Sequence, residues 1–152
     1  MVRRIPAALT LLMIAGLLTL PLIVAACFNR PLPEVLLTVL WLFFGAGCGE
    51  EAFFRGYIQS RVNEAFGRPF TLLGVRFGPG LIISSFLFGL VHALNTVNYF
   101  VGRYDFAWLW LIAGFFSGLF FGVLREKTGS VLAGAVVHGL EDVLGRLPAL
   151  LP

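Results

Sequence analysis

Long apolar runs, separated by short polar turns, are the feature that most constrains this chain. They cover residues 7–28, 35–48, 80–100, 107–124 and 131–147. A helix needs about 20 apolar residues to cross the hydrocarbon layer of a bilayer. The runs are continuous rather than alternating, which excludes a membrane β-barrel. The sequence therefore predicts an all-α, polytopic transmembrane helix bundle with about five to six spanning helices.

The composition agrees with a membrane protein. Hydrophobic residues make up 59% of the chain and charged residues 12%, whereas soluble domains carry about twice that charged fraction. The eleven Lys and Arg residues that give a net charge of +3 are scattered, and nucleic-acid binding would require a cluster. We expect an integral membrane protein, with the lipid bilayer as a partner and no nucleic acid. The compact single-domain chain favours the bacterial inner (cytoplasmic) membrane. The sequence gives no indication of the oligomeric state.

Residues 1–30 are predicted to form an N-terminal transmembrane helix, and residues 31–152 a catalytic helix bundle. Arg3 and Arg4 place the N-terminus in the cytoplasm, and the loop charges then put the C-terminus on the opposite side. A cleaved signal peptide is one alternative, although the apolar run exceeds the usual 7–15 residues of such a peptide. A lipoprotein processing box at Val24-Ala25-Ala26-Cys27 is another. Otherwise Cys27 and Cys48 are interpreted as small packing residues.

The second run is too short to span a bilayer unless its helix continues through the charged residues to Phe66, which we expect. Loops are predicted at residues 67–79 and 102–105, and a tight charged turn at 125–130. Gly114, Gly118 and Gly122 form a small-residue stripe on the fourth span, which permits close approach of a neighbouring helix and indicates packing.

Charged groups lie at the end of the second apolar run, where ionisable residues are costly and usually functional. Glu51 and Arg55 are spaced i, i+4 and can pair on one helix face. Glu50 lies about 100° around the helix and is harder to pair. A glutamate without an ion-pair partner in a low-dielectric site suits a general base. A purely structural ion network of all three residues is the alternative.

Two other predicted spans carry polar groups. His92 is spaced i, i+4 from Phe88, and His138 is spaced i, i+4 from Asp142, with Glu141 rotated about 100° from Asp142. Because helices in a bundle can turn their polar faces toward one pocket, we expect these groups to converge with Glu50.

The sequence patterns around Glu50, His92 and His138 resemble the three motifs of the CPBP family. This family groups CAAX prenyl endopeptidases with bacteriocin-processing and abortive-infection (ABI) membrane proteins. The motifs stand here as Glu50-Glu51-Ala52-Phe53-Phe54-Arg55, Phe88-Gly89-Leu90-Val91-His92 and His138-Gly139-Leu140-Glu141-Asp142. The similarity covers roughly residues 35–147 and leaves the first apolar run outside.

This resemblance implies a glutamate-type intramembrane endopeptidase that needs no cofactor. Glu50 would activate water with help from His92, and His138 and Asp142 would face the developing oxyanion. Glu51 and Arg55 would support the site as an ion pair, with Phe88 and Glu141 beside the catalytic groups. The implied substrates are membrane-associated proteins or peptides processed at a leader, a C-terminal sorting tag or a lipidated C-terminus.

Asp142 departs from the family pattern, where asparagine or a similar polar residue stands. An asparagine amide donates to an oxyanion, whereas an ionised aspartate only accepts. Asp142 would therefore donate only when protonated, or else orient His138.

Two alternatives remain open. Zinc could bind Glu50, His92, His138 and Asp142 chemically, although no HExxH pair places two ligands on one helix turn. The same groups could also serve as a proton relay or line a non-catalytic peptide-binding protein.

Overall fold

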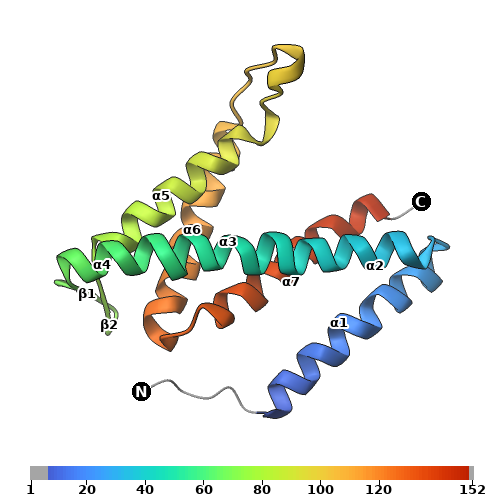
Figure 1. Ribbon diagram of the computed structural model, residues 1–152, viewed down its shortest axis with the longest axis horizontal. Helices are drawn as coiled ribbons and strands as arrows, with labels where there is room; N and C mark the ends of the chain where they lie inside the picture. Colours follow the sequence, from blue (N-terminus) through green and yellow to red (C-terminus); the bar gives the residue numbers. More distant parts are fainter. Residues whose placement is uncertain (1–6, 151–152) are drawn as a thin grey trace. The chain divides into compact units, whose positions relative to one another are not determined.

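One continuous helical segment, Leu32–Phe66, carries the paired glutamates. It confirms the prediction that the second apolar run continues through them, as Figure 1 shows. Two stretches of the segment are π-helical, and such wide turns are frequent at functional sites. The Ser60 hydroxyl donates to the Arg55 carbonyl, five residues back, at 2.9 Å. The segment consists of α2 (Leu32–Leu40), η1 (Trp41–Cys48), α3 (Gly49–Glu51), η2 (Ala52–Gln59) and α4 (Ser60–Phe66).

The computed structural model describes residues 7–150, and for residues 7–14, 17, 18, 28 and 147–150 it describes the backbone only. The chain forms two units. One holds the residues up to Glu50 and from Ala135 onward, and the other holds Glu51–Gly134. The predicted division into residues 1–30 and 31–152 stays a prediction.

In the first unit, α1 (Ala7–Phe28) turns back onto α2. Asn29 adopts a left-handed conformation with φ 50°, which asparagine tolerates at a helix C-terminus. Pro31 and Pro33 then start α2, where a missing N–H is harmless. The core of this unit consists of Val24 from α1, Val35 and Val39 from α2, and Val143 from α7 (Val131–Leu150).

In the second unit, a short antiparallel hairpin joins α4 to α5. The hairpin pairs β1 (Phe70–Leu72) with β2 (Val75–Phe77). Leu73 and Gly74 both have positive φ, 51° and 75°, as a two-residue turn between twisted strands requires. The prediction of a plain loop at residues 67–79 missed this hairpin.

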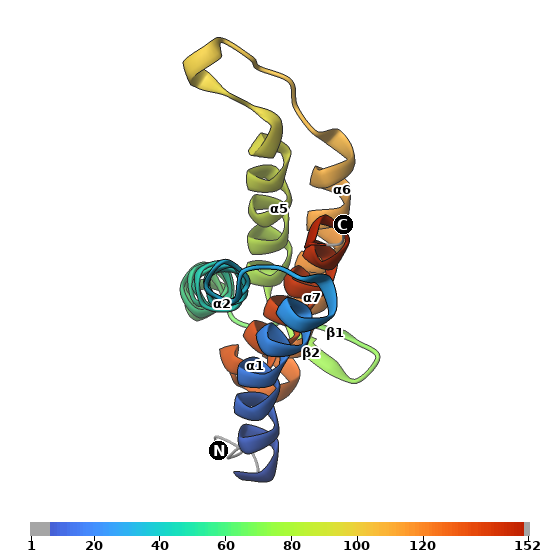
Figure 2. The ribbon, with the colours of Figure 1, turned by 90° about the vertical axis from the view of Figure 1, so that its right-hand side faces the viewer.

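α5 (Pro79–Ala93) and α6 (Trp108–Thr128) run side by side, as Figure 2 shows. A methyl group at Gly114 would lie 3.0 Å from the Gly89 Cα, and one at Gly118 would lie 2.9 Å from the Ser85 Cα. Real Cβ atoms rarely come so close. The interpretation of the glycine stripe as a packing surface is therefore confirmed.

Two predicted boundaries were wrong. The third span was expected to reach Phe100, but α5 ends at Ala93 and continues only as η3 (Leu94–Thr96), followed by η4 (Tyr99–Val101). The Asn98 side chain accepts a hydrogen bond from the Phe100 N–H and so stabilises this turn. The expected turn at residues 125–130 is mostly helix, because α6 continues to Thr128 and ends at Gly129 with φ 69°.

Within the described residues, three helices are long and apolar enough to cross a bilayer: Leu32–Phe66, Pro79–Thr96 and Trp108–Thr128. Five or six spans were predicted. The last predicted span, now α7, carries Glu141, Asp142 and Arg146, which lowers its apolar character. α1 has 22 residues, but the side chains of residues 7–14 lie outside the described set. The predicted helical membrane protein is confirmed, with a lower span count in the described part.

Two facing glycines bring η1 against α7 in the first unit. A methyl group at Gly47 would lie 2.7 Å from the Cα and N atoms of Gly139, and one at Gly139 would lie 2.7 Å from the Phe43 ring. No side chain fits at either contact. The sequence prediction singled out the glycines of α6 but not this pair.

Gly47→Ala should therefore destabilise the protein by about 1–3 kcal/mol through overpacking. Gly145→Ala on α7 serves as the matched control, because nothing lies within 4 Å of its Cβ position. This control should be neutral or slightly stabilising. Thermal unfolding in detergent, followed by circular dichroism, compares the two. Equal unfolding temperatures would contradict the close packing at Gly47.

Candidate active site

Glu51 and Arg55 form a buried ion pair in the second unit. The Arg55 Nη1 lies 2.7 Å from the Glu51 Oε1, and both side chains are inaccessible to solvent. The i, i+4 spacing predicted this pair. Burying two charges requires close pairing and further polar contacts.

The neighbouring helices supply those contacts. The Arg55 Nη2 donates a 3.2 Å hydrogen bond to the carbonyl of Gly118 on α6. Its guanidinium carbon lies 4.3 Å from the centre of the Phe88 ring on α5 and 5.3 Å from that of Phe121 on α6. Both distances are within the range of cation–π attraction. Arg55 therefore joins η2 to α5 and α6.

A second buried polar cluster extends the same helix face. The Gln59 Nε2 donates to the Gly122 carbonyl at 3.1 Å and to Glu126 at 2.8 Å. Asn63 donates to the same Glu126 oxygen at 2.6 Å, and Arg68 pairs with the other oxygen at 2.7 Å. Sequence reasoning missed this cluster, although Glu51, Arg55, Gln59 and Asn63 follow one another at four-residue intervals.

Residues of α5 pair with this helix face in antiparallel order. The Asn63 Oδ1 accepts the Gly80 N–H at 2.9 Å, and the Gln59 Oε1 lies 3.5 Å from the Ser84 hydroxyl. One turn further along, Arg55 of η2 lies against Phe88 of α5. Continued by one turn, this register leads us to expect His92 at the level of Glu51.

His92 is held by the residue one turn before it. Its Nδ1 lies 2.8 Å from the Phe88 carbonyl oxygen, and its ring centre lies 4.3 Å from that of Phe88. A carbonyl only accepts, so the Nδ1 carries the proton and donates it. In the neutral ring the Nε2 is then an acceptor, able to receive a hydrogen bond from water.

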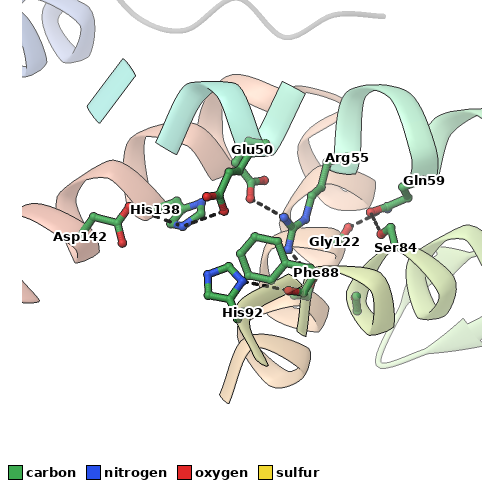
Figure 3. Close-up of polar contacts among 12 residues, drawn as sticks. Glu50, Arg55, Gln59, Ser84, Phe88, His92, Gly122, His138 and Asp142 are labelled. Atoms are coloured by element: carbon green, nitrogen blue, oxygen red, sulfur yellow. Dashed lines mark hydrogen bonds and ion pairs between the residues drawn. The ribbon is translucent and has the colours of Figure 1, made fainter. Parts of the chain in front are cut away.

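In the first unit, Glu50, His138 and Asp142 come together, as Figure 3 shows. The His138 Nε2 lies 4.0 Å from the Glu50 Oε2 and 3.7 Å from the Asp142 Oδ2. The His138 side chain is 5% exposed, whereas those of Glu50 and Asp142 are 34% and 30% exposed. Gly47 and Gly139 are close to Glu50 and His138 in the sequence. Because neither glycine has a side chain, η1 and α7 can approach closely at this point.

This geometry permits acid–base chemistry on a third group. Both separations exceed the length of a direct hydrogen bond. The imidazole and the two carboxylates are nevertheless close enough to share protons with a bound water molecule or a substrate oxygen. The Glu50 side chain is partly exposed, whereas that of Glu51 is enclosed.

The predicted site residues thus fall into two groups, one in each unit: Glu50, His138 and Asp142, and then Glu51, Arg55, Phe88 and His92. Their convergence on one pocket stays a prediction. Glu141 is exposed on α7, so its supporting role also stays a prediction. Among the described residues, no three His, Cys, Asp or Glu side chains are grouped closely enough to hold a metal ion.

The comparison with known proteins assigns a family to the chain. A family model described as "Type II CAAX prenyl endopeptidase Rce1-like" matches residues 32–144. The match includes all three motifs and leaves α1 outside. No curated protein and no solved structure matches the chain. The extent of the family match and the apolar helices identify the chain as a member of the type II CAAX prenyl endopeptidase Rce1-like family, an integral membrane protein with the intramembrane endopeptidase activity that this family implies.

Proposed function

We propose that this chain hydrolyses a peptide bond of a membrane-associated protein or peptide with a water molecule activated by Glu50. The observation that supports this most directly is the grouping of Glu50, His138 and Asp142, with Glu50 partly exposed. The enclosed Glu51 is held by Arg55. The two adjacent carboxylates therefore have different environments, which is typical of a site that uses one of them as a base.

Glu50 acts as the general base. It takes a proton from water as the oxygen attacks the carbonyl carbon, and it passes that proton to the leaving amine. His92 assists through its Nε2, which the hydrogen bond from Nδ1 to Phe88 leaves as an acceptor. Glu51, Arg55 and Phe88 support this arrangement by fixing the helix that carries Glu50 and the orientation of the His92 ring.

His138 and Asp142 serve the oxyanion side. The His138 Nε2–H donates to the carbonyl oxygen as negative charge develops there, where a preorganised donor stabilises the transition state. Asp142, whose Oδ2 lies 3.7 Å from the same Nε2, favours the protonated form of the His138 ring when ionised. A protonated Asp142 would add a second donor.

The family description suggests prenylated C-termini as substrates. Leader peptides and C-terminal sorting tags are the other candidate substrates. We place the protein in a bacterial inner membrane. Hydrolysis by Glu50 needs no cofactor. A zinc-dependent reaction is the competing mechanism, and chelation separates the two.

Glu50→Gln should abolish peptide cleavage by proteoliposomes while leaving thermal unfolding unchanged, because the amide cannot accept the proton from water. Glu64→Gln is the matched control. Glu64 is exposed and pairs only locally with Arg61, at 2.9 Å, so its loss should leave turnover intact. Unchanged cleavage by the Glu50 variant would refute the mechanism.

Variants of Asp142 test the oxyanion side. Asp142→Asn should keep or raise activity, because the amide can donate. Asp142→Ala should be slower by about 10²–10³-fold, the usual effect of losing such a donor. All active forms should work in the presence of EDTA. Stoichiometric zinc in the purified protein, together with turnover that EDTA stops, would instead establish a metalloprotease.

A further inference from the structure

An apolar pocket of about 350 Å³ lies in the second unit, where the β-hairpin meets α5 and α6. None of its lining residues belongs to the candidate active site. α5 contributes Leu81 and Ile82, and α6 contributes Leu119, Val123 and Lys127. The three residues of α6 are spaced at four-residue intervals, so they form one stripe along that helix. Lys127 is the only charged group on this part of the pocket.

The hairpin lines the pocket with its apolar face. Residues two apart in a strand point to the same side of a sheet, and the register pairs Phe70 with Phe77 and Leu72 with Val75. These four side chains therefore share one face, and three of them, Leu72, Val75 and Phe77, line the pocket. Val75 is buried, whereas Leu72 is 64% exposed. The pocket is therefore open toward the hairpin tip.

Leu73, at the tip of the hairpin, indicates a contact outside the protein. Its side chain lines the same pocket and is 92% exposed. Its backbone has φ 51°, a conformation that is unfavourable for leucine and is usually adopted by glycine or asparagine. Backbone strain of this kind is often retained for function. Here it presents an apolar side chain at the opening of an apolar pocket.

The pocket lies at the ends of two candidate membrane spans. Lys127 is in the last turn of α6, and Leu81 is in the first turn of α5. The ends of spanning helices lie where the acyl chains meet the headgroups. A lysine there extends its aliphatic stem along apolar surface and holds its ammonium at the level of the headgroups. The neighbouring Glu126 pairs with Arg68 at 2.7 Å, so its charge does not neutralise Lys127.

We propose that this pocket binds one anionic phospholipid, with an acyl chain against the apolar walls and the phosphate at the Lys127 ammonium. The observation that carries this is an open apolar pocket with one exposed cation at its rim. A phospholipid has the complementary arrangement, an apolar chain next to a negative headgroup, and basic pockets between membrane helices bind such headgroups. This lipid site is independent of the proposed peptide hydrolysis.

The first test measures the headgroup preference by native mass spectrometry of the full chain released from detergent micelles. Phosphatidylglycerol should bind about fivefold more tightly than phosphatidylcholine, as expected for one lysine at a membrane surface. Lys127→Gln should remove this preference. Arg76→Gln is the matched control, because Arg76 is exposed and its strand position points it away from Val75 and Phe77.

The control should keep the preference for phosphatidylglycerol. An equal loss in both variants would assign the preference to general surface charge and refute the pocket. Inorganic phosphate should not displace the lipid, because it has no acyl chain. Displacement by phosphate alone would assign the site to a free anion and overturn the proposal.

The second test uses Leu73→Asn to separate the acyl chain from the headgroup. Asparagine tolerates a positive φ, so this variant should unfold at the same temperature as the wild type or higher. It should nevertheless bind both lipids more weakly, because it removes apolar contact with the chain, whereas Lys127→Gln should weaken only phosphatidylglycerol. Unchanged binding of both lipids by Leu73→Asn would contradict the proposed position of the chain.

The third test locates the bound lipid directly. Phosphatidylglycerol with a diazirine near the end of one acyl chain is irradiated with the protein in phosphatidylcholine nanodiscs, and the labelled residues are identified by peptide mass spectrometry. Labels should concentrate on residues 72–77 and on Leu119 and Val123. Labels spread evenly over the exposed faces of α5 and α6 would indicate bulk lipid only and would refute the site.

Discussion

The buried ion pair between Glu51 and Arg55 is the interaction on which the second unit depends. Two charges removed from water are costly, and their attraction offsets this cost only with close geometry and additional hydrogen bonds. Here the pair is 2.7 Å apart, and Arg55 also contacts the Gly118 carbonyl and the Phe88 ring. The partners of Arg55 thus come from three different elements, α3, α5 and α6. The requirement to satisfy one guanidinium therefore fixes where those helices meet.

The same requirement separates the functions of two adjacent glutamates. Successive residues of a helix point about 100° apart, so Glu50 cannot share the environment of Glu51. Glu50 instead faces His138 across the contact between Gly47 and Gly139. Glycines at that contact let the helix backbones approach, which a larger residue would prevent. Because Glu50 and Glu51 are consecutive in one helix, they point in different directions, and we assign a structural role to Glu51 and a reactive role to Glu50.

Local spacing made part of this arrangement predictable. The i, i+4 intervals gave the Glu51–Arg55 pair, the His138–Asp142 pair and the glycine packing of α6. The same interval would have revealed Gln59 and Asn63, whose burial depends on Glu126 of a distant helix. The β-hairpin was missed because one positive-φ position is a leucine, Leu73, rather than a typical turn residue. The contact between Gly47 and Gly139 arises from tertiary packing, which no local pattern encodes.

A comparison of Glu50→Gln with Glu51→Gln tests most directly whether one carboxylate holds the structure and the other reacts. The two substitutions make the same chemical change at adjacent positions, so differences report the environment alone. Thermal unfolding and peptide turnover are measured on both variants in the same proteoliposomes. We predict that Glu51→Gln is destabilised by about 3–5 kcal/mol, because it leaves a buried guanidinium without its counter-charge, and that Glu50→Gln keeps its stability and loses turnover. Equal stability of both variants, or turnover retained by Glu50→Gln, would contradict this division of function.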